Sequence, residues 1–330
     1  MDRSRLLLYS FLLGCAILCL CLPGSSALIA YSANDILSGN SMNSNAYAAE
    51  AQQHDSSISA AQFYQLTSGL RPGRGQPIPP ASTIQDELPV TDISFYNFRG
   101  YRISGWLAVS APHAPVIILL HGTPGNRMSM LSRATFLYQH GYNVLLFDFQ
   151  SYGNSQGIIS TLGMVESEDI LAAIDYVHSR SDTFDSKIGL LGLSMGATAS
   201  VLAAARSNDV VAVVAESCPV DATLVTGDVP SEEARLADTE LVEQVYGVDI
   251  TQARPIDVIG ELSEHNTAVF LINGDSDSVT PLAGMYDLYQ NAGPPRQYWV
   301  VPGAEHAQSF DIDTAGYEQR VDAFFDAYFS

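Results

Sequence analysis

Positive charge is scarce in this sequence. Its 330 residues include 15 Lys and Arg against 36 Asp and Glu, which gives a net charge of −21, and Lys187 is the sole lysine. A surface of this charge repels the phosphates of nucleic acids and gives no electrostatic attraction to anionic lipids. We therefore expect no nucleic-acid partner.

Cysteine is also scarce. Of the four cysteines, only Cys218 lies beyond residue 21, so no intramolecular disulfide is expected, and we interpret this residue as a small buried side chain at a strand end. After residue 27 the sequence lacks the His-x-x-x-His and Cys-x-x-Cys spacings typical of zinc sites. The glycines at 122–125 are not followed by the Lys-Ser or Lys-Thr of a phosphate-binding loop. No metal and no cofactor are therefore expected.

The N-terminal segment has the pattern of a secretory signal. Arg3 and Arg5 precede a mostly apolar stretch at 6–22, and small residues follow as far as Ala27. Cleavage after residue 27 would release an exported protein, whereas retention would leave a membrane anchor near the lower length limit for spanning. Lipidation at Cys15 is a third outcome, because the residues before it resemble a bacterial lipobox. All three outcomes place the rest of the chain outside the cytoplasm, in the periplasm or the extracellular space.

The rest of the chain divides into a spacer and one large domain. Residues 28–90 are rich in Ser, Asn, Ala, Gln and then Pro, which predicts a low-complexity spacer. From residue 91 to 330 strand and helix patterns alternate, as in a mostly parallel sheet with helices on both faces. An antiparallel hairpin is expected at 93–98 and 101–109. Further strands are predicted at 116–120, 143–148, 187–191, 210–215, 268–272 and 297–301, and helices near 129–140, 164–180, 195–206, 281–291 and 313–328.

The most informative motif is Gly192-Leu193-Ser194-Met195-Gly196, between a predicted strand and a predicted helix. A strand that turns at once into a helix strains the backbone of the central residue, and a Cβ at either glycine would clash with the turn. Ser194 would then project above the sheet, and the N–H of Met195 would face a developing oxyanion at the helix N-terminus. The motif predicts a nucleophilic serine. The alternative is a serine that only caps the helix.

A nucleophilic serine needs a base that removes its proton and an acid that orients the base. His306 ends the loop after the strand at 297–301, and the near-neutral pKa of histidine suits the base. The acidic turn after the strand at 268–272 offers Asp277 and Asp275, and Asp221 is a more distant alternative.

The order Ser, Asp, His at successive strand ends resembles the α/β-hydrolase fold over about residues 90–330. The loop that begins His121-Gly122-Thr123-Pro124 is similar to the family's His-Gly loop, which supplies a second oxyanion N–H. Because Pro124 has no N–H, Thr123 is the expected donor. The family's spacing of Gly, Asp, Val and Pro favours Asp277 as the acid. Gln150-Ser151 stand where the family usually carries Arg-Gly, which removes the arginine of that loop's usual ion pair.

The resemblance implies an eight-stranded, mostly parallel sheet with a short lid inserted at about 219–265. It also implies a serine hydrolase of the single-domain branch that contains carboxylesterases and acyl thioesterases. Ser194, deprotonated by His306 and assisted by Asp277, would attack the carbonyl of an acyl ester or thioester. The N–H groups of Met195 and Thr123 would hold the oxyanion.

Two other functions stay open at this point. The same fold includes serine peptidases and amidases, although those related enzymes usually carry an additional large domain, and the polar, Pro-rich residues before 90 do not predict one. The fold also includes non-catalytic binding modules that have lost their catalytic residues, and the intact Ser, Asp and His of this chain argue against that function.

Overall fold

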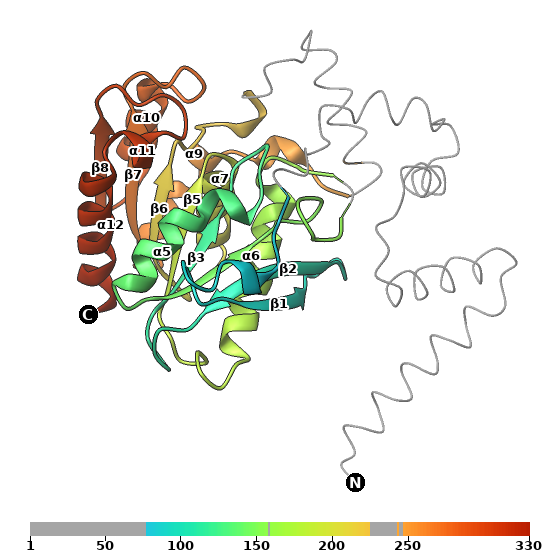
Figure 1. Cartoon of the computed structure of the whole chain (residues 1–330). Helices are drawn as coiled ribbons and strands as arrows, with labels where there is room; N and C mark the ends of the chain where they lie inside the picture. Colours follow the sequence, from blue (N-terminus) through green and yellow to red (C-terminus); the bar gives the residue numbers. More distant parts are fainter. Residues whose placement is uncertain (1–76, 158, 225–242, 244–246) are drawn as a thin grey trace, which may run out of the picture.

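The computed structural model describes residues 77–157, 159–224, 243 and 247–330 (Figure 1). The predicted signal or anchor at 1–27 and the spacer as far as residue 76 lie outside the described residues. Of the predicted lid, the part between residues 224 and 247 also lies outside them, apart from residue 243. Among the described residues, no helix combines the length and the apolar character that crossing a membrane requires.

Eight strands form one sheet in the order β1-β2-β4-β3-β5-β6-β7-β8. β1 and β2 form an antiparallel hairpin, β2 pairs antiparallel with β4, and all neighbours from β4 to β8 are parallel. The predicted eight-stranded, mostly parallel sheet is confirmed. The strands are β1 (Thr91–Tyr96), β2 (Arg102–Ala108), β3 (Val116–Leu120), β4 (Asn143–Phe147), β5 (Ile188–Leu193), β6 (Val210–Glu216), β7 (Ala268–Gly274) and β8 (Arg296–Val301).

Helices cover both faces of the sheet and create two hydrophobic cores (Figure 1). Successive residues of a strand point to opposite faces, so β3 sends Ile118 into the core under α6, α7 and α10, and Ile117 into the core under α5 and α12. Both faces are covered, which explains why the central strands are apolar along their whole length. The helices are α5 (Leu131–Gln139), α6 (Met164–His178), α7 (Met195–Ala204), α9 (Pro255–Val258), α10 (Leu282–Asn291), α11 (Ser309–Ile312) and α12 (Thr314–Phe329).

Short 3₁₀ helices complete the fold: η2 (Ala81–Thr83), η3 (Arg127–Met130), η4 (Ala222–Leu224), η5 (Ile250–Gln252) and η6 (Ile259–Ser263). Within the predicted lid, the described segments 219–224 and 247–265 contain η4, η5, α9 and η6 but no strand. Ile259 and Leu262 of η6 are fully buried in the core under α7 and α10. The end of the predicted lid is therefore part of the helical layer that covers the sheet.

The described fold begins earlier than residue 91. Ala81 of η2, Leu88 and Val90 are buried, and all three pack into the core under α5 and α12. Residues 77–90 were assigned to the spacer because of their prolines and polar residues, but their few apolar side chains cover the sheet next to β2. The packed core of the described chain thus includes side chains from residues 81–90.

The turn of the β1–β2 hairpin is longer than predicted. β1 ends at Tyr96 and β2 begins at Arg102. The side-chain oxygen of Asn97 accepts hydrogen bonds from the backbone N–H groups of Arg99 and Tyr101, at 3.0 and 2.9 Å. The Asn97 side chain thus takes the Tyr101 N–H that a further ladder pair would direct to the Asn97 carbonyl oxygen, and the regular ladder ends at the pair Tyr96–Arg102.

The termini of β5 face opposite ends of the sheet. Lys187 precedes the strand, and its ammonium donates hydrogen bonds to the carbonyl oxygens of Phe329 and Ser330, at 2.9 Å each. Ser194 follows the strand at its carboxyl end, where the loops after β7 and β8 also lie. In open α/β sheets, ligands bind at the carboxyl ends of the strands.

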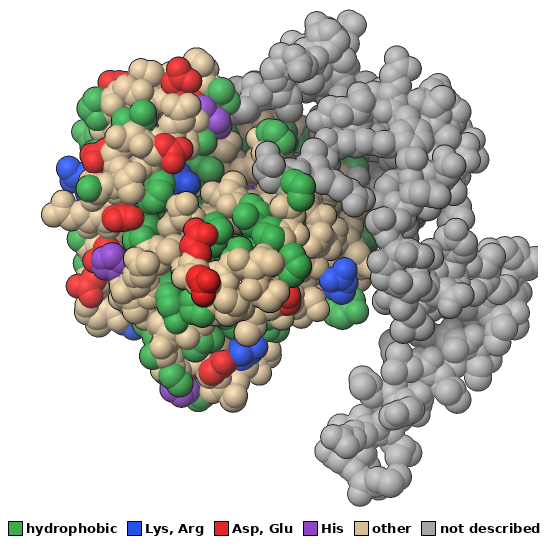
Figure 2. Space-filling model, viewed as in Figure 1, with side chains coloured by type: hydrophobic (Ala, Val, Ile, Leu, Met, Phe, Trp, Pro, Cys, Tyr) green, Lys and Arg blue, Asp and Glu red, His purple; other side chains and the backbone are tan. Residues whose placement is uncertain are grey.

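On the face shown in Figure 2, Asp and Glu side chains are spread singly among uncharged residues, and Lys and Arg are few.

Candidate active site

Ser194 lies in the sharp turn between β5 and α7. Its backbone is left-handed, with φ of 54° and ψ of −116°, and its N–H donates to the carbonyl oxygen of Glu216 at 2.9 Å. A Cβ on Gly192 would overlap the carbonyl oxygen of Gly196, and a Cβ on Gly196 would overlap that of Leu120. Both flanking positions therefore require glycine, and the turn has the geometry of a nucleophile elbow.

The structure brings Ser194, His306 and Asp277 together. Nε2 of His306 lies 3.0 Å from Oγ of Ser194, and its Nδ1 lies 2.9 Å from Oδ2 of Asp277. A carboxylate only accepts hydrogen bonds, so Nδ1 carries the proton and Nε2 is free to accept the proton of the serine hydroxyl. This is the arrangement that general-base activation of a serine requires.

Asp277 is held as a carboxylate. Its Oδ1 accepts hydrogen bonds from the N–H groups of Val279 and Thr280, and its Oδ2 accepts from the Thr280 hydroxyl at 2.7 Å. Burial alone would raise the pKa of Asp277, but the hydrogen bonds from His306 and Thr280 outweigh it and lower the pKa to about 2. The acid is therefore charged over the whole physiological range.

The two alternative acids lie elsewhere. Asp275 accepts hydrogen bonds from the N–H of Gly303 at 2.7 Å and from the Ser276 hydroxyl. Asp221 pairs with Arg254 and accepts from the N–H of Thr223 at 2.9 Å. Asp275 thus fastens the acid loop to the base loop without touching the imidazole, and Asp221 belongs to the segment after β6.

The loop after β3 lies against the elbow. A Cβ on Gly122 would be 3.2 Å from the Cβ of Ser194. Nε2 of His121 accepts the N–H of Phe149 at 3.2 Å, so its Nδ1 is protonated and donates to the carbonyl oxygen of Gly122 at 2.8 Å. Burial lowers the pKa of His121 to about 4, with the charge of Arg127 adding to the effect, and the ring stays neutral. His121 therefore fixes the backbone next to Ser194.

The two predicted oxyanion donors, Met195 and Thr123, each follow one residue of the contact between Ser194 and Gly122. Met195 is the first residue of α7, so its N–H has no acceptor within the helix and is available to a ligand. Thr123 follows Gly122 directly, is exposed, and its side chain forms a hydrogen bond with the phenol of Tyr152. The same phenol lies 3.2 Å from Sδ of Met195. One buried tyrosine thus contacts both residues whose N–H groups are expected to face an oxyanion.

An ion pair is present in the loop after β4 although Gln150 replaces the usual arginine. Asp148 pairs with Arg127, with 3.3 Å between Oδ2 and Nη1, and both side chains are buried. Arg127 belongs to η3, just after the His-Gly loop, and its guanidinium lies 4.6 Å from the centre of the Trp106 ring. The sequence put this loop's usual ion pair in doubt, and in the structure the loop has an ion pair whose cation comes from a different segment of the chain.

A second buried ion pair was not predicted. Arg133 of α5 forms two-pronged hydrogen bonds with Glu216 at 2.9 to 3.1 Å, and the Tyr317 hydroxyl donates to the same carboxylate at 2.9 Å. Glu216 ends β6 and accepts the Ser194 N–H through its carbonyl oxygen. Glu216 and Arg133 are 83 residues apart, so only strand pairing brings them together, although a charged residue that ends an apolar strand run is itself an unusual pattern.

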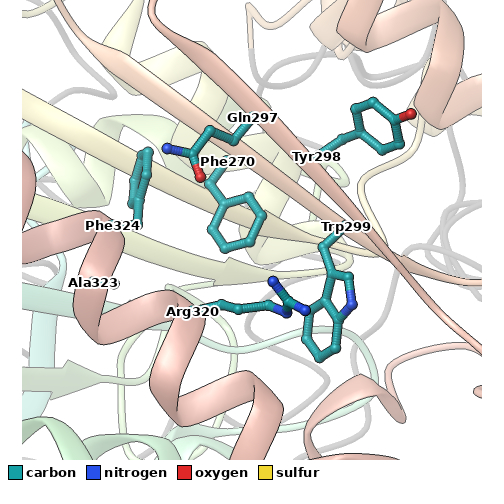
Figure 3. Close-up of a pocket in the computed structure, with 7 residues that line it drawn as sticks. All are labelled: Phe270, Gln297, Tyr298, Trp299, Arg320, Ala323 and Phe324. Carbon is teal, nitrogen blue, oxygen red and sulfur yellow. The ribbon is translucent and has the colours of Figure 1, made fainter.

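The described residues also form a pocket of about 210 Å³ between β8 and α12 (Figure 3). In this pocket the Arg320 guanidinium lies over the indole of Trp299, 5.0 Å from the ring centre. The pocket contains none of Ser194, His306 and Asp277, so it is separate from the candidate active site. Its lining residues are Phe270, Gln297, Tyr298, Trp299, Arg320, Ala323 and Phe324.

Within the described ranges, no group of three or more His, Cys, Asp or Glu side chains is arranged to hold a metal ion. Cys218 is buried, and burial raises the pKa of its thiol well above the usual range, so it is an inert neutral side chain. The candidate site is the hydrogen-bonded group of Ser194, His306 and Asp277.

Comparison with known proteins agrees with this architecture. A sequence profile of the X-Pro dipeptidyl-peptidase (S15) family matches residues 43–226, more than half of the chain. The protein YfhR of Escherichia coli O157:H7 is 26% identical over 233 residues, which cover 68% of this chain and 76% of YfhR. The protein Rv2307c of Mycobacterium tuberculosis is 27% identical over 238 residues, which cover 70% of this chain and 76% of Rv2307c.

Two solved structures share the fold. The esterase Pf2001 of Pyrococcus furiosus superposes with a TM-score of 0.63 at 22% identity, covering 78% of this chain and 100% of the esterase. The α/β hydrolase GrgF of Penicillium sp. sh18 superposes with a TM-score of 0.61 at 18% identity, covering 73% of this chain and 99% of GrgF. The strand order, the elbow and these likenesses define a serine hydrolase of the α/β-hydrolase fold. Within that class, the chain belongs to the X-Pro dipeptidyl-peptidase (S15) family.

Proposed function

We propose that this hydrolase cleaves carboxylic esters or thioesters through an acyl-enzyme. The observation that carries the proposal is the alignment of Ser194, His306 and Asp277, with 3.0 Å between Oγ and Nε2 and 2.9 Å between Nδ1 and the carboxylate. A likeness in fold to the esterase Pf2001 supports the choice of ester chemistry. The substrate class depends on the shape of the acyl pocket, which fold likeness alone does not define.

In the first half of the reaction, Oγ of Ser194 bonds to the carbonyl carbon while its proton moves to Nε2 of His306. The N–H groups of Met195 and Thr123 stabilise the oxyanion, and Asp277 stabilises the imidazolium. His306 then returns the proton to the leaving alcohol or thiol as its bond to the carbonyl carbon breaks.

In the second half, a water molecule loses a proton to His306 and attacks the acyl-enzyme. The bond between Ser194 and the acyl group breaks, Oγ takes the proton back, and the free acid leaves. The elbow holds Oγ of Ser194 at the carboxyl end of β5 in both halves. His306 can therefore act as the base in each half.

The proposal is tested with the purified full chain, a fluorophosphonate probe and p-nitrophenyl esters of increasing acyl length. Ser194→Ala and His306→Ala should each lower kcat/KM by on the order of 10⁴-fold or more, and Ser194→Ala should abolish labelling. Ser179→Ala is the matched control, because this serine at the end of α6 is exposed and, among the described residues, its hydroxyl donates only to the carbonyl oxygen of Tyr176, at 2.7 Å. A folded wild type that neither reacts with the probe nor turns over any ester would refute the proposal.

A second candidate function is favoured by the family match itself. The match to X-Pro dipeptidyl-peptidases spans 43–226, which includes Ser194 but neither Asp277 nor His306. Peptidase activity would use the same chemistry on an amide, with the leaving amine protonated by His306. A dipeptidyl anilide with proline in the second position separates the two functions in the same assay. Faster cleavage of this anilide than of every ester would replace the esterase proposal with a peptidase.

A further inference from the structure

Three backbone positions at or near the serine and the base are strained. Seven non-glycine residues of the described part have a positive φ, and three of them are Ser194 at 54°, Ser217 at 50° and Ala307 at 63°. This conformation is disfavoured for residues with a Cβ, and it persists only where the surrounding contacts hold it. Ser194 owes it to the elbow. Ser217 follows β6, and Ala307 follows His306, so the strained positions are adjacent to the proposed nucleophile and base.

Hydrogen bonds join these positions through the dipeptide 216–217. The carbonyl oxygen of Glu216 accepts the Ser194 N–H at 2.9 Å. The N–H of Ser217 donates to the carbonyl oxygen of Ile272 in β7 at 2.9 Å, and its Oγ accepts the N–H of Ala307 at 3.1 Å. Two consecutive residues are thus bonded to the serine turn, to the strand that leads to the acid, and to the residue after the base.

The base loop is fastened at both ends. Before His306, the loop is tied to the acid loop, because the N–H of Ser276 donates to the carbonyl oxygen of Ala304 at 3.0 Å and the Gly303 N–H donates to Asp275. After His306, the Ser217 hydroxyl accepts the next N–H of the chain. Ser217 is fully buried, so its hydroxyl is fixed by packing.

We propose that Ser217 is a positioning residue for the base. Its hydroxyl holds the backbone after His306 so that Nε2 stays at hydrogen-bonding distance from Oγ of Ser194. The inference rests on the proposed function, because it concerns the same proton transfer. Ser217 acts through His306 and does not touch the substrate.

The test compares Ser217→Ala with Ser217→Gly in the full chain. Both remove the acceptor of the Ala307 N–H, and a shift of about 1 Å in a catalytic group lowers the rate by on the order of 10²-fold. We expect kcat of both variants to fall by roughly 10 to 100-fold with KM within about twofold of the wild type. Glycine also relieves the strain at a φ of 50°, so Ser217→Gly should unfold at higher urea than Ser217→Ala.

Ser217→Ala and Ser217→Gly are therefore expected to have equal activity but different stability. Two equally slow variants of different stability support positioning, whereas activity that follows stability would overturn it. A second readout uses the His306→Ala background, where Ser217→Ala should cause no further loss of the residual rate because the residue through which it acts is absent.

The outcomes for the inference and for the proposed function are distinct. Wild type that fails to label and to hydrolyse esters overturns the proposed function. Wild type that is active, with Ser217→Ala equal to it in kcat, overturns only the role of Ser217. An equal loss on Ser217→Ala with and without the imidazole would also overturn that role.

Discussion

Two buried ion pairs lie at the carboxyl ends of β4 and β6, and they are built differently. Arg133 and Glu216 form two-pronged hydrogen bonds of 2.9 to 3.1 Å. In contrast, Nη1 of Arg127 lies 3.3 Å from Asp148, and among the described residues its Nε and Nη1 have no hydrogen-bond partner. Asp148 accepts backbone N–H groups instead, including that of Asn154 at 2.8 Å. In the Arg133–Glu216 pair, the two charged groups hydrogen-bond each other. In the Arg127–Asp148 pair, backbone N–H groups hydrogen-bond the carboxylate instead.

The pKa shifts also differ between the two ion pairs. Burial tends to lower the pKa of Arg133, but the charge of Glu216 outweighs it, so the pKa is raised. Burial lowers the pKa of Arg127 and raises that of Asp148, because the charge of each partner only partly compensates. A buried pair stabilises the fold only when good geometry and additional hydrogen bonds offset the loss of water. The Arg133–Glu216 pair meets this condition, and the Arg127–Asp148 pair meets it only in part.

The largest effect on stability is expected for Glu216→Gln. The change leaves the guanidinium of Arg133 buried without its charge partner, which should lower the free energy of unfolding by about 3 to 5 kcal/mol in urea titrations. Asp182→Asn is the control, because the Arg180–Asp182 pair is partly exposed and should cost about 1 kcal/mol or less. Similar losses in the two variants would contradict the special role of the buried pair.

A smaller effect is expected from acid titration of Asp277. Its pKa is lowered from 3.8 to about 2 in the folded protein, so the unfolded chain binds more protons between these values. The resulting stability, about 2 kcal/mol, is fully present above pH 4 to 5 and is lost as the pH falls through about 2.

Asp277→Asn should therefore flatten the acid limb of stability measured from pH 2 to pH 6. The contribution of Asp148 to stability changes with pH in the opposite direction, because its raised pKa makes this contribution largest when the side chain is protonated. Removing Asp148 should not flatten the acid limb, and a flattening equal to that of Asp277→Asn would show that the two carboxylates do not differ in this way.

The smallest of the three effects is expected for Arg127→Met. The variant removes a cation whose hydrogen bonds are incomplete, and it leaves Asp148 with its backbone donors and a raised pKa. We expect a loss of about 1 kcal/mol at neutral pH that shrinks as the pH falls and Asp148 takes up a proton. Guanidinium or urea unfolding at pH 5 and pH 7.5 measures it. A loss as large as that of Glu216→Gln would remove the distinction between the pairs.

These pairs also show what the sequence can predict. The central strands were predicted to within two residues, because their apolar runs are local signals. The residues of the candidate site could be selected for a similar reason: Ser194, Asp277 and His306 each follow a strand, and the carboxyl ends of parallel strands meet at one edge. Their catalytic roles stay predictions until the variants are measured.

The missed features depend on contacts across the chain. Arg133 and Glu216 are separated by 83 residues, and Ser217 and Ala307 by 90, so no short pattern links them. Arg127 supplies the cation that position 150 lacks, and the sequence of the loop after β4 alone does not show this. The buried side chains at 81–90 were missed because their segment is rich in proline and polar residues. Local patterns thus predict the elements, whereas the supporting contacts follow from packing.

The position of Lys187 has a practical consequence. It carries the sole ε-amine of the chain, and it precedes β5 at the end opposite to Ser194. A strand of six residues separates the two, or about 20 Å at 3.3 Å per residue. Coupling to a solid support through this side chain would attach the molecule by the end of β5 opposite to Ser194. The serine would then face the liquid, and immobilised enzyme would keep its site open to substrate.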